Sequence, residues 1–289
     1  MSRSYYNEWE SYPADWMESL MAEDLIMPGD IDRRSIRRVR YKEVIDYEQA
    51  HFFAGIGGWS YALRLAGWPD SAPVWTGSCP CQPLSTAGRG FDPDDERHLW
   101  PVWFRLIRKC RPPVIFGEQA ARGAGKYWLT AVRADLETAD YAFGAASLSA
   151  ASAGAPHSRP RFFWCAYSRG QRLERLKEAW SEAGLSIGSP GELPAVGAPG
   201  HWGRAGGDLH LPWDDSGQML LSRSRRVDER PVWRTAARCS IQSGIPVVVD
   251  GLPRRMGKHR SEQIQAIGNS IVPQLAATFI QSSLLAVFG

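Results

Sequence analysis

Features that mark several specialised protein classes are missing from this chain of 289 residues. No apolar run reaches the roughly 18 residues of a membrane-spanning helix. The first residues continue into acidic, Trp-containing sequence, so we expect no signal peptide, no membrane association and a cytoplasmic protein. Five cysteines are too few, and odd in number, for a disulfide framework, which indicates reduced thiols. Internal repeats and low-complexity tracts are absent too.

A large excess of charge of one sign is also missing, because the formal net charge is only +3. The basic residues are nevertheless clustered, and such clusters suit contacts with phosphates. A solvated basic surface would give the same pattern, so the clusters alone do not establish binding to nucleic acid. The clusters are Arg33, Arg34, Arg37, Arg38, Arg40 and Lys42; Arg223, Arg225, Arg226 and Arg230; and Arg254, Arg255, Lys258, His259 and Arg260.

Strand-like segments alternate with helix-like segments over most of the chain, which predicts an α/β fold with a mostly parallel sheet. Apolar spacing separates the two kinds of segment. Strands are expected at 49–55, 73–77, 114–116, 141–151 and 161–167, and helices within 8–25, 59–66, 97–109, 127–138 and 261–287.

The composition changes along the chain and suggests four parts. Residues 1–46 are predicted to be an N-terminal extension, and residues 47–167 to form a catalytic domain. Residues 168–255 contain a stretch rich in Gly, Pro and polar residues and are expected to form a loop-rich module. Residues 256–289 are expected to return to the catalytic domain through a C-terminal helix.

A cysteine on a stiff loop is the strongest chemical signal. Cys81 lies between Pro80 and Pro83, whose fixed φ angles and missing N–H groups exclude a helix or a central strand. Such a loop is a poor place for a packing residue and a good one for a nucleophile. The pair Cys79 and Cys81 could instead hold a metal, but no second Cys/His cluster has ligand spacing, so no metal is expected.

Four further motifs accompany this loop at predicted strand or helix ends, where α/β folds bind ligands. They are Phe53-Ala54-Gly55-Ile56-Gly57-Gly58, Gly117-Glu118-Gln119, Pro156-His157-Ser158-Arg159-Pro160-Arg161-Phe162 and Gly268-Asn269-Ser270. In this order and spacing the set resembles the DNA (cytosine-5)-methyltransferase family, over residues 49–167 and 250–289. The resemblance implies a Rossmann-like, methyltransferase-type sheet and places a small target recognition domain at 168–255.

The resemblance also implies a role for each motif. Cys81 would add to carbon 6 of a cytosine flipped out of double-stranded DNA, and Glu118 would hydrogen-bond or protonate ring nitrogen 3. Arg161 would contact the base carbonyl oxygen, and Arg159 would support the site. The cofactor-binding residues would be Phe53, Gly55, Gly57, Gly58, Trp59, Asn269 and Ser270. The DNA-binding residues would be Gln82, Ser85, Arg223, Arg225 and Arg226 in a monomer.

The sequence departs from the family between Gly58 and Pro80, where only about twenty residues are present. The family places two strands and a helix there, with acidic residues that bind the ribose and adenine of S-adenosylmethionine. Here Asp70 is the only carboxylate, so the chain looks like a shortened phage or bacterial member without the usual nucleoside-binding strands. The family's Glu-Asn-Val is also Glu118-Gln119-Ala120, and His157 replaces its Gln.

Three explanations compete for this shortening. The N-terminal extension could rebuild the nucleoside site, for instance with Glu43 or Asp46; the protein could be an inactive DNA-binding protein; or it could use another donor. The third explanation is narrowly favoured, with 5,10-methylenetetrahydrofolate as the donor in place of S-adenosylmethionine. The product would then be 5-hydroxymethylcytosine and not 5-methylcytosine. A flat pterin needs stacking aromatic rings, and four tryptophans lie near the motifs. They are Trp59, Trp68, Trp100 and Trp103.

Overall fold

A seven-stranded sheet forms the centre of the computed structural model, which describes residues 3–80, 98–121, 125–150, 159–169, 171–183 and 269–288. The strand order is β2-β1-β3-β4-β5-β7-β6; the first five strands are parallel, and β7 is antiparallel to both its neighbours. The strands are β1 (Ser4–Asn7), β2 (Gly29–Asp32), β3 (Gln49–Phe52), β4 (Val74–Gly77), β5 (Val114–Ala120), β6 (Tyr141–Ser149) and β7 (Pro160–Ser168). This confirms the expected α/β class.

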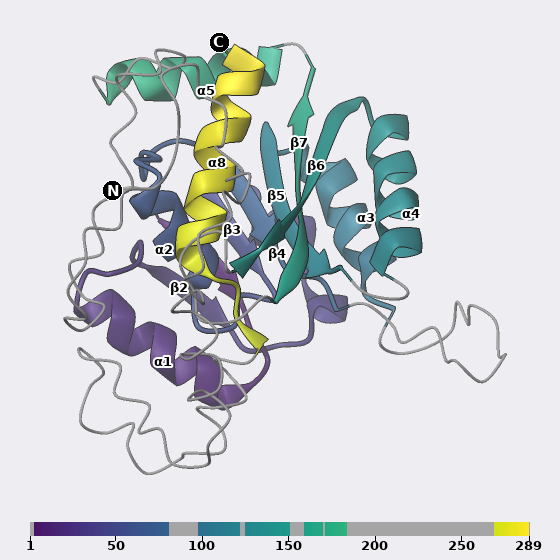
Figure 1. The fold of residues 1–289 in the computed structure, drawn as a ribbon. Coiled ribbons are helices and arrows are strands. Elements are labelled where there is room, and N and C mark those ends of the chain that lie inside the picture. The colour runs from purple at the N-terminus through teal and green to yellow at the C-terminus, as the bar shows by residue number, and fades with distance from the viewer. Residues whose placement is uncertain are drawn as a thin grey trace, which may run out of the picture.

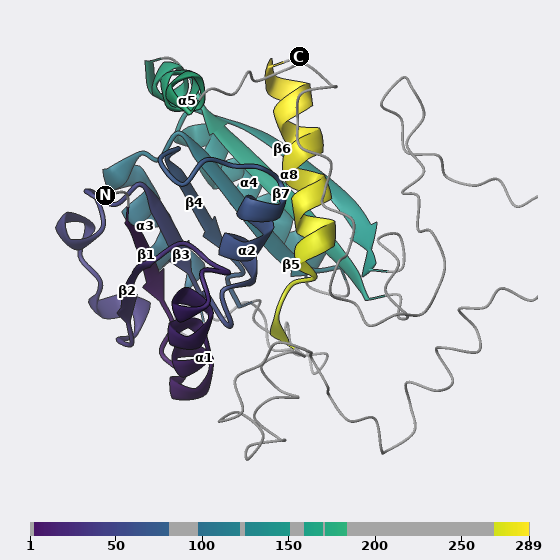
Figure 2. The ribbon, with the colours of Figure 1, turned by 90° about the vertical axis from the view of Figure 1, so that its left-hand side faces the viewer.

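Helices cover both faces of the sheet (Figures 1 and 2). One face carries α1, α2, α5 and α8, and the other carries α3, α4 and two short 3-10 helices, η1 and η2. The helices are α1 (Ser11–Ala22), η1 (Ile36–Arg38), η2 (Tyr41–Glu43), α2 (Gly58–Leu65), α3 (Trp100–Cys110), α4 (Gly125–Thr138), α5 (Gln171–Glu182) and α8 (Pro273–Phe288). The expected C-terminal helix therefore returns to the sheet, where α8 packs against α2.

The N-terminal segment, expected to be an extension, supplies two strands of this sheet. β1 pairs with β3, and β2 pairs with β1. Alternate side chains of β1 explain its central position: Tyr5 packs with Phe52 towards α3, whereas Tyr6 packs with Met17 of α1 on the opposite face. Both tyrosines are buried, and the Tyr6 hydroxyl donates to the Met27 carbonyl oxygen at 2.6 Å.

Two crossovers in this part of the sheet have opposite hands. From β1, α1 leads outwards to β2; from β3, α2 leads in the other direction to β4, over the same face. The connections β2 to β3 and β4 to β5 run over the other face and share the hand of the first crossover. Since about 98% of such crossovers are right-handed, the unit β3-α2-β4 is the left-handed one.

The chain is thus shortened between Gly58 and Pro80, as expected, but the sheet is not. Its two outer positions beyond β3 are filled by a strand–helix–strand unit from the N-terminus, β1-α1-β2. The order of segments along the chain differs from the family's pattern, while the places in the sheet are occupied.

Helix α5 joins the same core, although it falls within the stretch 168–255 predicted to form a separate module. Trp180 of α5 packs edge-to-face against Trp68, with ring centroids 5.5 Å apart. Leu176 and Trp180 are both buried with Phe116 and Phe163 of the sheet. The remainder of that stretch, from residue 184, lies outside the described residues.

Candidate functional site at the carboxyl edge of the sheet

The glycine turn after β3 forms the floor of the candidate site. Phe53, Gly55 and Gly57 have φ angles of 51°, 56° and 78°, so the chain leaves the strand through left-handed conformations before α2 begins. A side chain at Gly57 would place its Cβ 3.0 Å from Ile26, whereas a Cβ at Gly55 would meet nothing within 4 Å. The Gly55 position therefore opens onto free space, as a backbone cradle for a ligand requires.

Glu8, directly after β1, closes one side of this turn. Its Oε2 accepts a hydrogen bond from the Gly55 N–H at 2.8 Å, and its Oε1 accepts one from the Glu10 N–H at 2.9 Å. The residue is only 8% exposed, and this burial raises the pKa of its carboxyl group despite the two amide donors. A buried carboxylate thus lies against the glycine turn.

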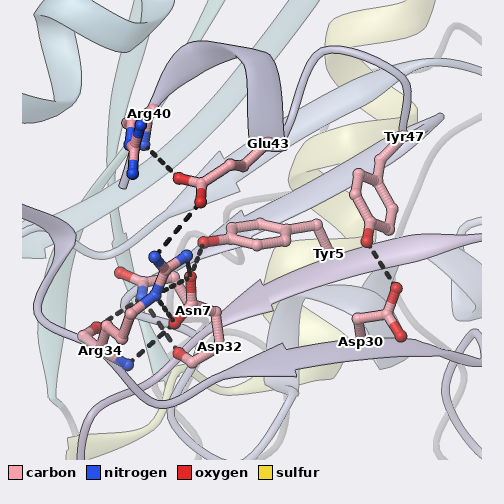
Figure 3. A network of polar contacts seen from close by, with 8 residues as sticks. All are labelled: Tyr5, Asn7, Asp30, Asp32, Arg34, Arg40, Glu43 and Tyr47. Atoms are coloured by element: carbon pink, nitrogen blue, oxygen red, sulfur yellow. Dashed lines mark hydrogen bonds and ion pairs between the residues drawn. The ribbon is translucent and has the colours of Figure 1, made fainter. Parts of the chain in front are cut away.

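The strand ends beside Glu8 are tied together by polar contacts (Figure 3). The Asn7 side-chain amide donates to the carbonyl oxygens of Asp32 and Arg34, at 3.1 and 2.8 Å. Asp32 accepts from the Tyr5 hydroxyl at 2.7 Å and pairs with Arg34 at 2.6 Å. Burial alone would raise the pKa of Asp32, but these donors hold it below its usual range. Asp32 therefore serves the fold and fixes the end of β2.

Trp9 is the most exposed tryptophan in the described residues, with 72% of its surface accessible. It follows Glu8 immediately in the sequence. An indole face at this position suits stacking with a flat heterocycle.

The opposite half of the edge contains Glu118, near the end of β5. Its Oε1 pairs with the Arg161 Nε at 2.6 Å, across the antiparallel register of β5 and β7. Burial raises the pKa of Glu118, and the nearby guanidinium groups of Arg161 and Arg159 oppose that rise without cancelling it. The structure thus brings these three predicted residues together.

Arg159 links this half to the C-terminal segment. Its Nη2 donates to the Ser270 carbonyl oxygen at 3.0 Å, and its φ of 26° lies in the strained positive region. Burial and the neighbouring Arg161 lower the pKa of its guanidinium. Ser270 is half-buried, whereas Asn269 is exposed. Ile271 follows them and lies 3.0 Å from the position of a Cβ on Gly58, so this segment packs beside the glycine turn.

The segment that leads to the Cys81 loop is anchored from both sides. The Trp59 indole N–H donates to the Ser78 hydroxyl at 3.1 Å, and the Gln119 amide donates to the Cys79 carbonyl oxygen at 3.0 Å. The loop therefore leaves the sheet between the two halves of the edge, at the end of β4. The predicted residues Cys81, Gln82, Ser85, Arg223, Arg225 and Arg226 lie outside the described residues.

Several aromatic rings expected near a cofactor are instead core residues. Trp59 is 2% exposed and stacks on Phe116, so its ring is part of the core. The other three tryptophans considered for stacking on a pterin are buried as well. They are Trp68, Trp100 and Trp103.

The carboxylates considered for a nucleoside site are also placed differently from expectation. Asp70 pairs with Arg64, and Glu43 pairs with Arg34. Asp46 lines a hollow with Tyr47 just before β3, at the amino end of the strands. Glu8, which sequence reasoning missed, holds the position next to the glycine turn. The signal for it was the strand–helix–strand spacing of residues 4–32, which matches the unit absent after Gly58.

Among the described residues, no group of three or more His, Cys, Asp or Glu side chains has the arrangement of a metal site. None of the helices in this part of the chain is long and apolar enough to cross a membrane.

The chain is similar in sequence and in structure to known methyltransferases. Residues 69–189 match the family model of C-5 cytosine-specific DNA methylases. This part of the chain is therefore similar to a C-5 cytosine-specific DNA methylase domain. The methylase match contains the Cys81 loop, Glu118 and both arginines, and it begins just after α2, where the order of strands departs from the family's pattern.

Solved structures similar to the chain are methyltransferases of low sequence identity. A DNMT2 of Spodoptera frugiperda is 13% identical with a TM-score of 0.37, covering 58% of this chain and 50% of that one. A putative DNA modification methyltransferase from an E. coli prophage is 14% identical with a TM-score of 0.35, covering 58% and 47%. The Entamoeba histolytica methyltransferase EhMeth is 14% identical with a TM-score of 0.40, covering 100% and 99%. The chain thus spans about half the length of the first of these structures, and no curated protein matches it.

Proposed function

We propose that the protein is a DNA cytosine-C5 methyltransferase that uses S-adenosylmethionine. One observation carries the choice of donor: β1 and β2 fill the two sheet positions beyond the glycine turn, and Glu8 binds the Gly55 N–H at 2.8 Å. A folate donor would be favoured if such strands were absent and the tryptophans were free to stack, but these tryptophans are buried. Strands in these positions, with a carboxylate beside the glycine turn, support the ordinary donor of the family.

The residues present fit this donor. The open Gly55 cradle leaves room for a ligand against the backbone, the Glu8 carboxylate offers acceptors for a ribose diol, and Trp9 offers a flat face for adenine. When bound, S-adenosylmethionine supplies an electrophilic methyl group. The glycine turn would be fixed by close packing at Gly57 and Gly58. A Cβ at either position would lie 3.0 Å from a neighbouring side chain, which at Gly58 belongs to the segment after Ser270.

The chain's own residues would perform the base chemistry. Cys81, as thiolate, would add to carbon 6 of a flipped cytosine in double-stranded DNA and make carbon 5 nucleophilic. Glu118 would donate a proton to ring nitrogen 3, which its raised pKa favours. Arg161 would bind the carbonyl oxygen of the base. After methylation, loss of the carbon 5 proton and of the thiolate would restore the aromatic ring.

Direct measurement of the product tests this proposal. Duplex DNA would be incubated with the protein and either S-adenosylmethionine or 5,10-methylenetetrahydrofolate, and the modified cytosine would be identified by mass. We expect one added methyl group with S-adenosylmethionine alone, and no product with Cys81→Ser. An added hydroxymethyl group with the folate alone would replace the proposed donor, and DNA binding without any product would favour an inactive DNA-binding protein.

A further inference from the structure

The basic cluster at residues 33–42 divides into two kinds of residue in the fold. Arg33 pairs with Asp15 and Glu18, both at 2.7 Å, so its charge is balanced within the N-terminal unit. Arg34 is balanced in the same way by Asp32 and Glu43. Arg38 and Lys42, in contrast, are exposed, and no carboxylate of the described residues lies within ion-pair distance of either.

Helix α3 adds three exposed cations to that surface. Arg108 and Lys109 come three and four residues after Arg105, so all three lie on the outer side of the helix, and α3 contains no acidic residue. With Pro101 and Phe104 they line a hollow of about 260 Å³. The Arg108 guanidinium lies over the Phe104 ring, 6.0 Å from its centroid. In the described part of the chain these cations have no ion-pair partner.

The two groups of cations belong to one surface. Both η1 and η2 pack against α3, with Ile36 and Val39 in the same core cluster as Trp103 and Leu106. At the end of α3 the Cys110 sulfur lies 3.6 Å from the Tyr41 carbonyl oxygen, next to Lys42. We call the five exposed cations the α3 basic surface: Arg38, Lys42, Arg105, Arg108 and Lys109.

We propose that the α3 basic surface binds the phosphate backbone of duplex DNA outside the modified site. The proposal rests on DNA being the substrate, because the charge fits a polyanion. Unpaired cations release counterions from DNA on binding, whereas Arg33 and Arg34 already have partners. Arg105 and Lys109 are separated by about 6 Å along the helix axis, which is close to two nucleotide steps of one strand. This surface lies on the α3 face of the sheet, opposite the α1, α2 and α8 layer.

Salt-dependent DNA binding tests the surface. The triple variant Arg105→Gln, Arg108→Gln, Lys109→Gln would be compared with Arg33→Gln, Arg133→Gln, Lys177→Gln, which loses the same charge from residues paired with carboxylates. Fluorescence anisotropy would give the affinity for a long duplex over a series of salt concentrations. We expect the slope of log K against log salt to fall by about 2 to 3 in the first triple variant and by less than about 1 in the control.

Equal slopes in the two triple variants would overturn the proposal. Equal slopes are also the result expected if the α3 basic surface binds a protein partner and not DNA. The double variant Arg38→Gln, Lys42→Gln tests the same surface from another element, with an expected fall of about 1 to 2, so a folding defect in α3 does not leave the question open. Product formation on a short duplex separates this proposal from the proposed function. If the protein makes no product but the salt dependence of DNA binding still falls in the first triple variant, the DNA-binding surface is supported and the proposed methyltransferase function is not.

Discussion

The two halves of the carboxyl edge each contain one buried carboxylate, and they hold it by different means. Glu8 accepts hydrogen bonds from the main-chain amides of Gly55 and Glu10. Glu118 is instead paired with a side-chain cation, Arg161, at 2.6 Å. Main-chain donors fix a carboxylate as part of a turn, whereas a guanidinium beside it tunes its proton affinity. Under the proposed function, one half would recognise the donor and the other would move a proton.

Burial raises the pKa of both carboxyl groups, so proton affinity alone does not distinguish them. Their surroundings do. The ligand side of Glu8 contains a bare glycine turn and the exposed Trp9, which suit a neutral sugar and a flat ring. Glu118 lies beside Arg161 and Arg159, and both cations attract a base with partial negative charge on its oxygen. Substitutions on each side should therefore change different measured quantities.

The largest effect is expected from Glu118→Gln. Loss of the proton donor should lower the single-turnover rate by about 10²- to 10⁴-fold, because an amide holds the geometry but cannot protonate the ring nitrogen. Calorimetry should find the affinity for S-adenosylmethionine unchanged within about twofold, since a factor of two corresponds to well under 1 kcal/mol. A weaker donor affinity with an unchanged rate would reverse the roles of the two halves.

Glu8→Ala should show the opposite pattern. Removal of a carboxylate that accepts from the Gly55 amide and from a bound ribose should weaken donor binding by about 10- to 100-fold, the loss of a charged hydrogen bond. With saturating donor, the rate of the chemical step should stay within a few fold, about 1 kcal/mol. Glu10→Ala is the matched control, because Glu10 is exposed and contacts Glu8 only through its backbone. Equal losses in both variants would count against a specific role for Glu8.

The base half of this comparison could be predicted from the sequence. Its residues lie on a contiguous run from Pro80 to Arg161, in the order of the family, and strands β4, β5, β6 and β7 have clear apolar patterns. Glu118 and Arg161 pair because β7 is antiparallel to β5, so that β7 begins at the edge of the sheet where β5 ends. The role of each of these residues depends on one short motif and remains a prediction.

The donor half could not be predicted in the same way. β1 and β2 have four residues each, with the sequences Ser-Tyr-Tyr-Asn and Gly-Asp-Ile-Asp, and such short polar strands exist only because of their neighbours. Both strands come before β3 in the chain, whereas the family's corresponding strands come after it. The periodicity of apolar residues does not show which strands become neighbours in the sheet. The sequence also did not predict that four tryptophans are buried, because an aromatic ring suits a core and a cofactor site alike. They are Trp59, Trp68, Trp100 and Trp103.

A smaller effect should follow from Trp9→Ala. Loss of one stacking face should weaken S-adenosylmethionine binding by about three- to tenfold, without a change in the single-turnover rate. Trp9→Phe should retain most of the affinity, because a smaller ring still stacks. Tyr127→Ala removes another exposed aromatic ring, at the start of α4 in the base half, and should leave donor affinity unaltered. If none of the three substitutions changes the donor affinity, Trp9 does not stack on the donor.

The smallest effect concerns stability and pH, and it asks whether the two carboxylates cost the fold similar amounts. Burial raises both pKa values above the ordinary value of 4.5, so between the unfolded and folded pKa the native state binds more protons than the unfolded state. Stability should therefore fall as pH rises through the window that begins near 4.5 and ends above the folded pKa. Urea unfolding across this window should show a shallower fall for Glu8→Gln than for the parent. In Glu118→Gln the fall should be shallower too, but with a lower stability at every pH, because Arg161 loses its ion-pair partner among the described residues. A steeper fall in either variant would show that its carboxyl group is stabilised in the ionised form.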